Sequence, residues 1–136
     1  HTINKYNDVN SIIINENEIR QELRDNVSDI RVLGKTLVKN KKINNLIITR
    51  GSDGALLINK DCKIFSCPGF ALKSIDKVGA GDAMLSIASL GLKLKLDPEL
   101  VLFISSLAAA ISVESIGNKE HVTYQKLDRT LEYMLK

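Results

Sequence analysis

The chain has 136 residues, a formal net charge of +3 and 44% hydrophobic residues, which is enough for the core of one domain or of part of one. Its basic residues form no stripe interleaved with aromatic residues, and there are only three Phe and three Tyr, so nucleic-acid binding has little support. No stretch approaches the roughly 20 apolar residues of a membrane span, and the N-terminus shows no signal-peptide pattern. We therefore expect a cytoplasmic protein with no nucleic-acid partner and no membrane partner.

The first part of the chain contains a short apolar run at 11–14 and a helix-like stretch at 19–24. A second helix is predicted after it, with Ser28 as its N-cap and an interruption at Gly34. The polar sequence Asn15-Glu16-Asn17-Glu18 separates the apolar run from the first helix. It suits a helix start, because Asn caps helices and acidic residues complement the helix dipole.

Three strands are predicted in the middle of the chain, at 46–49, 55–59 and 63–67. The first is a continuous apolar run, as expected for a strand that is buried on both faces, and it ends in the turn cluster 50–54. The other two strands form a hairpin. Cys62 and Cys67 would close only a tiny disulfide loop, so we expect reduced thiols.

The remainder of the chain is predicted to be helical. One helix spans 83–94, the next begins with Asp97 as N-cap and Pro98 at its first position, and a final helix at 124–135 is capped by Thr123. Strands that alternate with helices and then form a hairpin predict an α/β fold, with a mostly parallel sheet and an antiparallel edge hairpin.

The most informative segment is the run 76–82, Asp-Lys-Val-Gly-Ala-Gly-Asp, which directly precedes a predicted helix. A tight turn at a helix start leaves backbone N–H groups unpaired, and the helix dipole favours negative charge there. The small residues let a phosphate approach the backbone, and Asp82 is placed to accept a proton from an attacking hydroxyl. The run predicts phosphoryl transfer, although a Gly-rich turn with a capping Asp would have the same residues.

This Asp-x-x-Gly-Ala-Gly-Asp run resembles the C-terminal signature of the PfkB (ribokinase-like) family of carbohydrate kinases. The resemblance implies that Asp82 is the catalytic base and that the amides of Gly79, Ala80 and Gly81 form the anion hole for the transferred phosphoryl group. Lys77 departs from the Thr that is commoner at its position. The family fold is a ribokinase-like three-layer sandwich, and residues 1–136 would be its C-terminal nucleotide-binding and catalytic part, within a longer chain.

The turn cluster matches a second element of the family, Thr-x-Gly-x-x-Gly, which lines the nucleotide site. The match implies ATP contacts for Thr49, Gly51 and Gly54, at the carboxyl end of a strand, where open α/β sheets bind ligands. A strand-turn-strand connection that needs glycine for its geometry explains the same residues. We expect the neighbouring Arg50 to face solvent rather than to reach a phosphate.

Asn15 and Glu18 match the family's Asn-x-x-Glu element, which organises Mg²⁺ and its waters beside the phosphates. Oxygen ligands and retained waters suit this ion. A helix cap with acidic first-turn residues explains the same positions, with Asn17 as an alternative cap, and both interpretations can hold together.

Two further sites follow from the resemblance alone. Ser106 aligns with a position that borders the adenine, although the family often has Asn or His there; close packing of a helix rich in small residues is the other explanation. In some family members, carbonyls of two loops hold a monovalent cation such as K⁺. The corresponding residues here are Asp76, Val78 and Gly117, and a helix C-cap also explains Gly117.

Together these segments predict ATP-dependent phosphoryl transfer to a sugar or sugar-phosphate hydroxyl, with ATP and Mg²⁺ as cofactors. The alternative is a truncated, catalytically silent module that binds nucleotide or anion, and we expect the isolated chain to be inactive. The resemblance implies a small-molecule sugar partner and a homodimer formed through a lid region that lies outside this chain. The sequence Gly-Ala-Gly-Asp-Ala-Met-Leu resembles the heptose-kinase-like branch, some members of which are fused to a nucleotidyltransferase. A dinucleotide-binding domain is disfavoured, because its glycines would follow an N-terminal strand.

Overall fold

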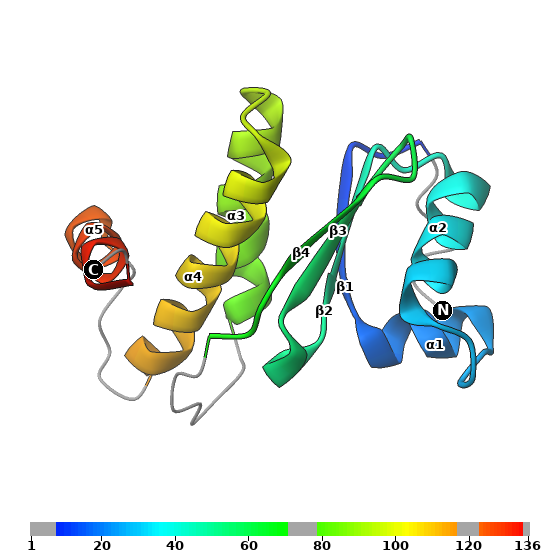
Figure 1. Cartoon of the computed structure of the whole chain (residues 1–136), viewed down its shortest axis with the longest axis horizontal. Helices are drawn as coiled ribbons and strands as arrows, with labels where there is room; N and C mark the ends of the chain where they lie inside the picture. The colour runs from blue at the N-terminus through cyan, green and yellow to red at the C-terminus, as the bar shows by residue number, and fades with distance from the viewer. Residues whose placement is uncertain (1–7, 71–78, 117–122, 135–136) are drawn as a thin grey trace. The chain divides into compact units, whose positions relative to one another are not determined.

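A computed structural model describes residues 8–70, 79–116 and 123–134. The chain divides into two compact units, His1–Gly69 and Phe70–Lys136. In the described residues, the first unit contains a sheet with two helices, and the second contains three helices (Figure 1).

The sheet of the first unit has four strands in the order β1-β2-β3-β4, namely β1 (Ser11–Asn15), β2 (Asn45–Thr49), β3 (Ala55–Asn59) and β4 (Ile64–Cys67). β1 and β2 are parallel, whereas the other two pairs are antiparallel. The prediction of a mostly parallel sheet is therefore wrong for the described strands. The cause is the connection 50–54, which is too short for the crossover that parallel neighbours need.

Two helices, α1 (Glu16–Leu23) and α2 (Ile30–Lys41), cover one face of the sheet (Figure 1). Alternate residues of the strands point toward them, because side chains alternate between the two faces of a strand. The resulting core contains Ile14, Ile19, Ile30, Leu33, Leu37, Val38, Ile43, Leu46, Ile48, Leu56 and Ile58. This core fixes the first turn of α1 and the end of β2 relative to each other.

The second helix differs from its prediction in two ways. Asp29, not Ser28, is its N-cap, since Asp29 Oδ1 accepts from the Arg31 N–H at 2.7 Å. The helix also continues through Gly34, which is buried. A Cβ at Gly34 would collide with Ile58 Cδ1, so the glycine lets α2 pack closely on the sheet.

The β3–β4 hairpin is confirmed, with its turn at 60–63. Cys62 and Cys67 are not joined by a disulfide, as predicted, and Cys67 Sγ donates to the Pro68 carbonyl at 3.5 Å.

The described part of the second unit consists of α3 (Ala80–Lys93), α4 (Pro98–Ile116) and α5 (Tyr124–Met134). α3 and α4 form a helical hairpin (Figure 1), in which a Cβ at Gly91 would stand 2.7 Å from Val101. The predicted caps are present: Asp97 Oδ1 accepts from the N–H groups of Glu99 and Leu100, and Thr123 Oγ1 accepts from the Lys126 N–H. α3 begins three residues earlier than the predicted start at 83, which places Gly81 inside the helix.

None of the helices in the described ranges combines the length and the apolar character needed to cross a membrane.

Candidate functional site

The first unit brings two of the predicted motifs to one edge of its sheet. β1 and β2 are parallel neighbours, and in their register Asn15 lies beside Thr49. The Asn15–Glu18 segment and the Thr49–Gly54 segment therefore leave the sheet side by side, at the carboxyl ends of adjacent strands. This is the edge at which α/β sheets bind ligands.

The start of α1 is a reciprocal capping box. Asn15 Oδ1 accepts from the Glu18 N–H at 2.8 Å, and Glu18 Oε2 accepts from the Asn15 N–H at 2.9 Å. Asn15 rather than Asn17 is thus the cap. Both side chains are exposed, so they keep further oxygen lone pairs on the surface, which fits the donor chemistry of Mg²⁺ and its waters.

The loop after β2 is a short 3₁₀ helix, η2 (Gly51–Asp53), which is exposed throughout. Gly54, with φ of 82°, ends it. A Cβ at Gly54 would collide with the carbonyl oxygen of Cys67, so the close approach of two backbones requires this glycine whether or not a ligand binds. Gly51 differs, because a Cβ there would have no neighbour within 4 Å among the described residues, and these surroundings leave room for a ligand.

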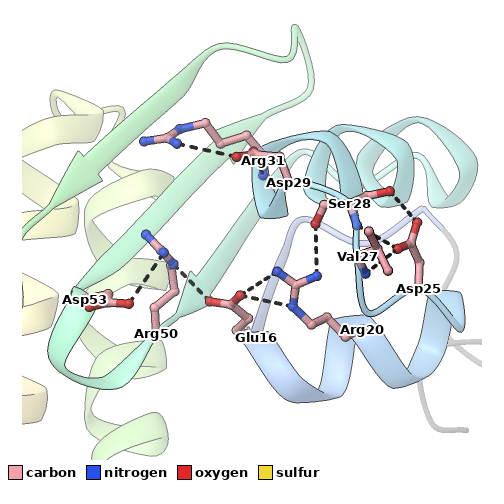
Figure 2. A network of polar contacts seen from close by, with 9 residues as sticks. All are labelled: Glu16, Arg20, Asp25, Val27, Ser28, Asp29, Arg31, Arg50 and Asp53. Carbon is pink, nitrogen blue, oxygen red and sulfur yellow. Dashed lines mark hydrogen bonds and ion pairs between the residues drawn. The ribbon is translucent and has the colours of Figure 1, made fainter.

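Arg50 was expected to face solvent, and this is wrong. Its side chain is only 23% exposed and its Nε donates to Glu16 Oε2 at 3.0 Å (Figure 2). Arg20 donates to the other oxygen of the same carboxylate. The hydrogen bond from Arg20 is the main cause that lowers the pKa of Glu16; the bond from Arg50 adds to it, and partial burial opposes it.

Sequence reasoning missed this cluster of Glu16, Arg20 and Arg50. The spacing of Glu16 and Arg20 by four helical positions was a local signal for their ion pair. The pairing with Arg50 spans 34 residues and has no local signal. It follows only from the parallel register of β1 and β2, which sets the residues after Asn15 and Thr49 next to each other.

The second unit holds the other predicted motif, at the start of α3. Gly79 is the N-cap, with φ of 86°, and no side chain of the described residues makes a capping hydrogen bond to this helix. The first four N–H groups of a helix have no intrahelical acceptor, so those of residues 79–82, which include the predicted anion hole, are candidates for binding an anion. A Cβ at Gly81 would meet no atom of the described residues within 4 Å, and the Asp82 side chain is exposed.

Ser106 lies on α4, and its hydroxyl oxygen is buried without a hydrogen-bond partner in the part of the chain that the structure describes. Its neighbour Ser105 is buried too, but Ser105 Oγ donates to the Leu102 carbonyl at 3.1 Å. Buried polar groups nearly always have a partner, so the orphan hydroxyl of Ser106 is compatible with a bound ligand or water.

The candidate monovalent-cation residues Asp76, Val78 and Gly117 lie outside the described residues. Across 8–70, 79–116 and 123–134, no group of three or more His, Cys, Asp and Glu is arranged to hold a metal ion.

The two units therefore offer different chemistry. The first presents oxygen atoms and a loop at the carboxyl edge of its sheet, and the second presents an open helix N-terminus with a carboxylate in its first turn. The latter combination suits an anionic group that reacts with a hydroxyl.

Comparison with known proteins identifies the family. The family model described as pfkB family carbohydrate kinase matches residues 2–123. The chain belongs to this family of carbohydrate kinases.

Eight curated relatives match, and six of them are bifunctional HldE proteins. The HldE protein of Koribacter versatilis is 33% identical over 104 residues, which is 76% of this chain and 21% of the relative. A deoxyribokinase of Salmonella typhi is 31% identical over 110 residues, or 81% of this chain and 35% of the relative.

Solved structures share the fold. Ribokinase from Thermotoga maritima matches with a TM-score of 0.75 and 23% identity, over 90% of this chain and 42% of that one. Phosphofructokinase-2 from Escherichia coli, in complex with potassium, matches with a TM-score of 0.80 and 18% identity, over 98% of this chain and 43% of that one. The same enzyme also matches in complex with fructose-6-phosphate and in a tetrameric inhibited form. The chain thus spans well under half the length of these relatives.

Proposed function

We propose that this chain is the nucleotide-binding and catalytic part of a kinase that transfers a phosphoryl group from ATP to a hydroxyl of a sugar or sugar phosphate. The observation that carries the proposal is the start of α3. Its N-cap is a glycine with a left-handed backbone, no side chain among the described residues caps its first N–H groups, and an exposed Asp82 lies in the first turn. Family membership supplies the class of reaction.

In the proposed reaction, Asp82 accepts the proton of the sugar hydroxyl as that oxygen attacks the γ-phosphorus of ATP. A new oxygen–phosphorus bond forms, the bond to the β–γ bridging oxygen breaks, and ADP leaves. The amides of Gly79, Ala80 and Gly81 donate to the phosphoryl oxygens, on which negative charge builds up. Positioning and fixed donors of this kind account for most catalysis of phosphoryl transfer.

The remaining assignments belong to the same proposal. Thr49, Gly51, Gly54 and Ser106 would contact the nucleotide, and the open surroundings of Gly51 and the orphan hydroxyl of Ser106 support this. Asn15 and Glu18 would hold Mg²⁺ and its waters, and this ion, when bound, neutralises phosphate charge.

The potassium complex of E. coli phosphofructokinase-2 supports a monovalent cation near Asp76, Val78 and Gly117, and the tetrameric form of that enzyme supports an oligomer. From the six HldE relatives we propose an acceptor of the kind that the heptose-kinase-like branch of the family uses. A cytoplasmic location stays a prediction.

The decisive variant is Asp82→Asn in an intact kinase that contains this chain. Loss of a general base lowers turnover by about 10²–10⁴-fold, whereas ATP affinity is expected to stay near that of the wild type. Steady-state kinetics and calorimetry with ATP and Mg²⁺ measure the two. Asp128→Asn, which removes another exposed carboxylate on α5, is the matched control. Full turnover in Asp82→Asn would refute the base.

A second candidate is favoured by coverage, because the chain spans only 21% to 43% of the relatives and structures compared above. In this case the chain alone binds nucleotide or anion but transfers nothing. Calorimetry with ATP and Mg²⁺, combined with a phosphoryl-transfer assay on the 136-residue chain, separates the two candidates. Binding without transfer supports the silent module.

A further inference from the structure

One carboxylate in the first unit is shared by two arginines from different segments. Glu16 Oε1 accepts from Arg20 Nε at 3.1 Å and from Arg20 Nη2 at 2.7 Å, and Glu16 Oε2 accepts from Arg50 Nε at 3.0 Å (Figure 2). The three side chains are 20–26% exposed. Ion pairs on an open surface contribute little, but these are partly shielded from water and oriented by hydrogen bonds.

On one side, the cluster reaches the base of the exposed loop. The Arg50 N–H donates to the Gly54 carbonyl at 2.8 Å, and the Arg50 carbonyl accepts from the Asp53 N–H at 3.1 Å. The Arg50 backbone is therefore hydrogen-bonded to Asp53 and Gly54 at the other end of the loop, while the Arg50 side chain is bound by Glu16. The additional pair of Arg50 with Asp53 is longer, at 3.7 Å, and Asp53 is 69% exposed, so Glu16 is the stronger partner.

On the other side, the cluster is anchored to the helical layer. Arg20 Nη1 donates to the Ser28 carbonyl at 3.0 Å, and Ser28 is fixed by Asp25, whose Oδ2 accepts from Ser28 Oγ at 2.6 Å (Figure 2). A continuous set of polar contacts therefore runs from the connection between α1 and α2, through the first turn of α1, to the loop after β2.

We infer that Glu16 is a positioning residue that holds the nucleotide loop Gly51–Asp53 through Arg50, and that it does not bind the metal ion. The nucleotide part of this inference rests on the proposed function. Glu16 lies between Asn15 and Glu18 in sequence, yet both of its oxygens are occupied by arginine, whereas Glu18 closes the cap. The two glutamates of Asn-Glu-Asn-Glu thus have separate tasks.

The physical effect is to order the loop before a ligand arrives. Each residue of a loose loop loses conformational entropy when it becomes fixed on a ligand, and a loop that is already held loses less on binding. Removing this tie, the ion pair between Glu16 and Arg50, is therefore expected to weaken nucleotide binding. It is not expected to unfold the unit, whose core contains neither residue.

The first test needs no ligand. Amide hydrogen exchange is measured at Asp53 and Gly54, whose N–H groups donate within the loop, in the wild-type chain and in Glu16→Gln. The substitution keeps the size of the side chain and removes its charge. Exchange in the loop is expected to accelerate about fivefold to tenfold, with the amides of β3 unchanged. Unchanged loop exchange in Glu16→Gln overturns the inference.

Glu22→Gln is the matched control, because Glu22 lies on the same helix and its side chain makes no polar contact among the described residues. It should leave loop exchange at the wild-type rate. Arg50→Gln should reproduce the effect of Glu16→Gln, Arg50→Lys should restore part of the protection, and the double variant should be no worse than either single one. Additive losses in the double variant would contradict a shared tie.

The second test separates positioning from a general structural effect. In an intact kinase that contains the chain, Glu16→Gln should raise the KM for ATP about fivefold to tenfold and leave kcat and the melting temperature close to wild type. A fall in kcat at unchanged KM overturns the inference. If the wild-type protein binds no ATP at all, the proposed function fails, whereas the tie is still decided by the exchange rates.

Discussion

The helices α1 and α3 begin in opposite ways. At α1, the side chains of Asn15 and Glu18 each accept a hydrogen bond from the other residue's backbone N–H, so the helix end is capped by side chains of the same segment. At α3, a glycine is the N-cap, and within the described ranges no side chain caps the helix and no atom lies within 4 Å of a Cβ added at Gly81. The comparison teaches that a helix N-terminus whose N–H groups are capped by side chains stabilises its unit. A helix N-terminus without such a cap can still bind an anion through its N–H groups.

The strongest way to break this comparison is Gly79→Ala. A residue with a Cβ at φ of 86° costs about 1–2 kcal/mol, so the free energy of unfolding should fall by that amount and the α3 start should shift. ATP affinity should fall with it. Urea denaturation and calorimetry measure both quantities. A variant as stable as the wild type would show that the left-handed cap is not required.

The opposite helix is tested by Asn15→Ala. Loss of a capping side chain costs about 1 kcal/mol of stability, within a range of 0.5–2, because the Glu18 N–H loses its acceptor. Denaturation of the chain without ligand measures this cost. Asn17→Ala is the control, since Asn17 lies in the same turn but does not cap the helix. Equal losses in both variants would contradict the assigned cap.

A sharper test of the open cap is Gly81→Ala, because stability and binding should move in opposite directions. Gly81 lies inside α3, where a Cβ would have no neighbour within 4 Å in the part of the chain that the structure describes, and replacing a helical Gly by Ala stabilises by up to about 1 kcal/mol. The added methyl group would stand where the proposed phosphoryl group approaches, so nucleotide affinity should fall. Denaturation and calorimetry on one preparation measure the two changes. Higher stability with unchanged affinity would argue against an anion at this helix end.

The smallest expected effect concerns Asp25. Its side chain accepts hydrogen bonds from N–H groups at the α1–α2 connection, much as the Asn15 side chain does at α1. The Ser28 hydroxyl, followed by the N–H groups of Ser28 and Val27, lowers the pKa of Asp25 from 3.8 to about 2. Because the folded-state pKa is the lower one, the stabilisation is complete above about pH 4 and is lost as the pH falls toward 2. Denaturation from about pH 5 to about pH 2 measures this loss. The free energy of unfolding should decline less steeply with falling pH in Asp25→Asn than in the wild type.

The sequence predicted well those features that depend on neighbouring residues. The caps at Asp97 and Thr123 and the β3–β4 hairpin are confirmed, because a capping side chain or a tight turn is encoded within a few positions. The family was also recognisable from the run 76–82 together with Thr49–Gly54, and the comparison with known proteins confirms it.

The sequence failed where packing decides the outcome. Gly34 disfavours helix locally, yet it lies within α2, where the helix packs closely on the sheet. The ion pair of Glu16 with Arg50 depends on the register of two strands that are far apart in sequence. Antiparallel pairing of β2 with β3 was not predicted, although a strand-turn-strand connection was one of the two interpretations of the turn cluster.

The position of β1 has a practical consequence. Among the described strands, β1 has a neighbour on one side only, so the peptide groups along its other side have no strand partner there, and its sequence Ser-Ile-Ile-Ile-Asn carries apolar side chains toward both faces. Such an edge strand can pair with a strand from another molecule. Concentrated preparations of the isolated chain should therefore self-associate, and a lysine introduced at Ile13 is expected to keep them dispersed.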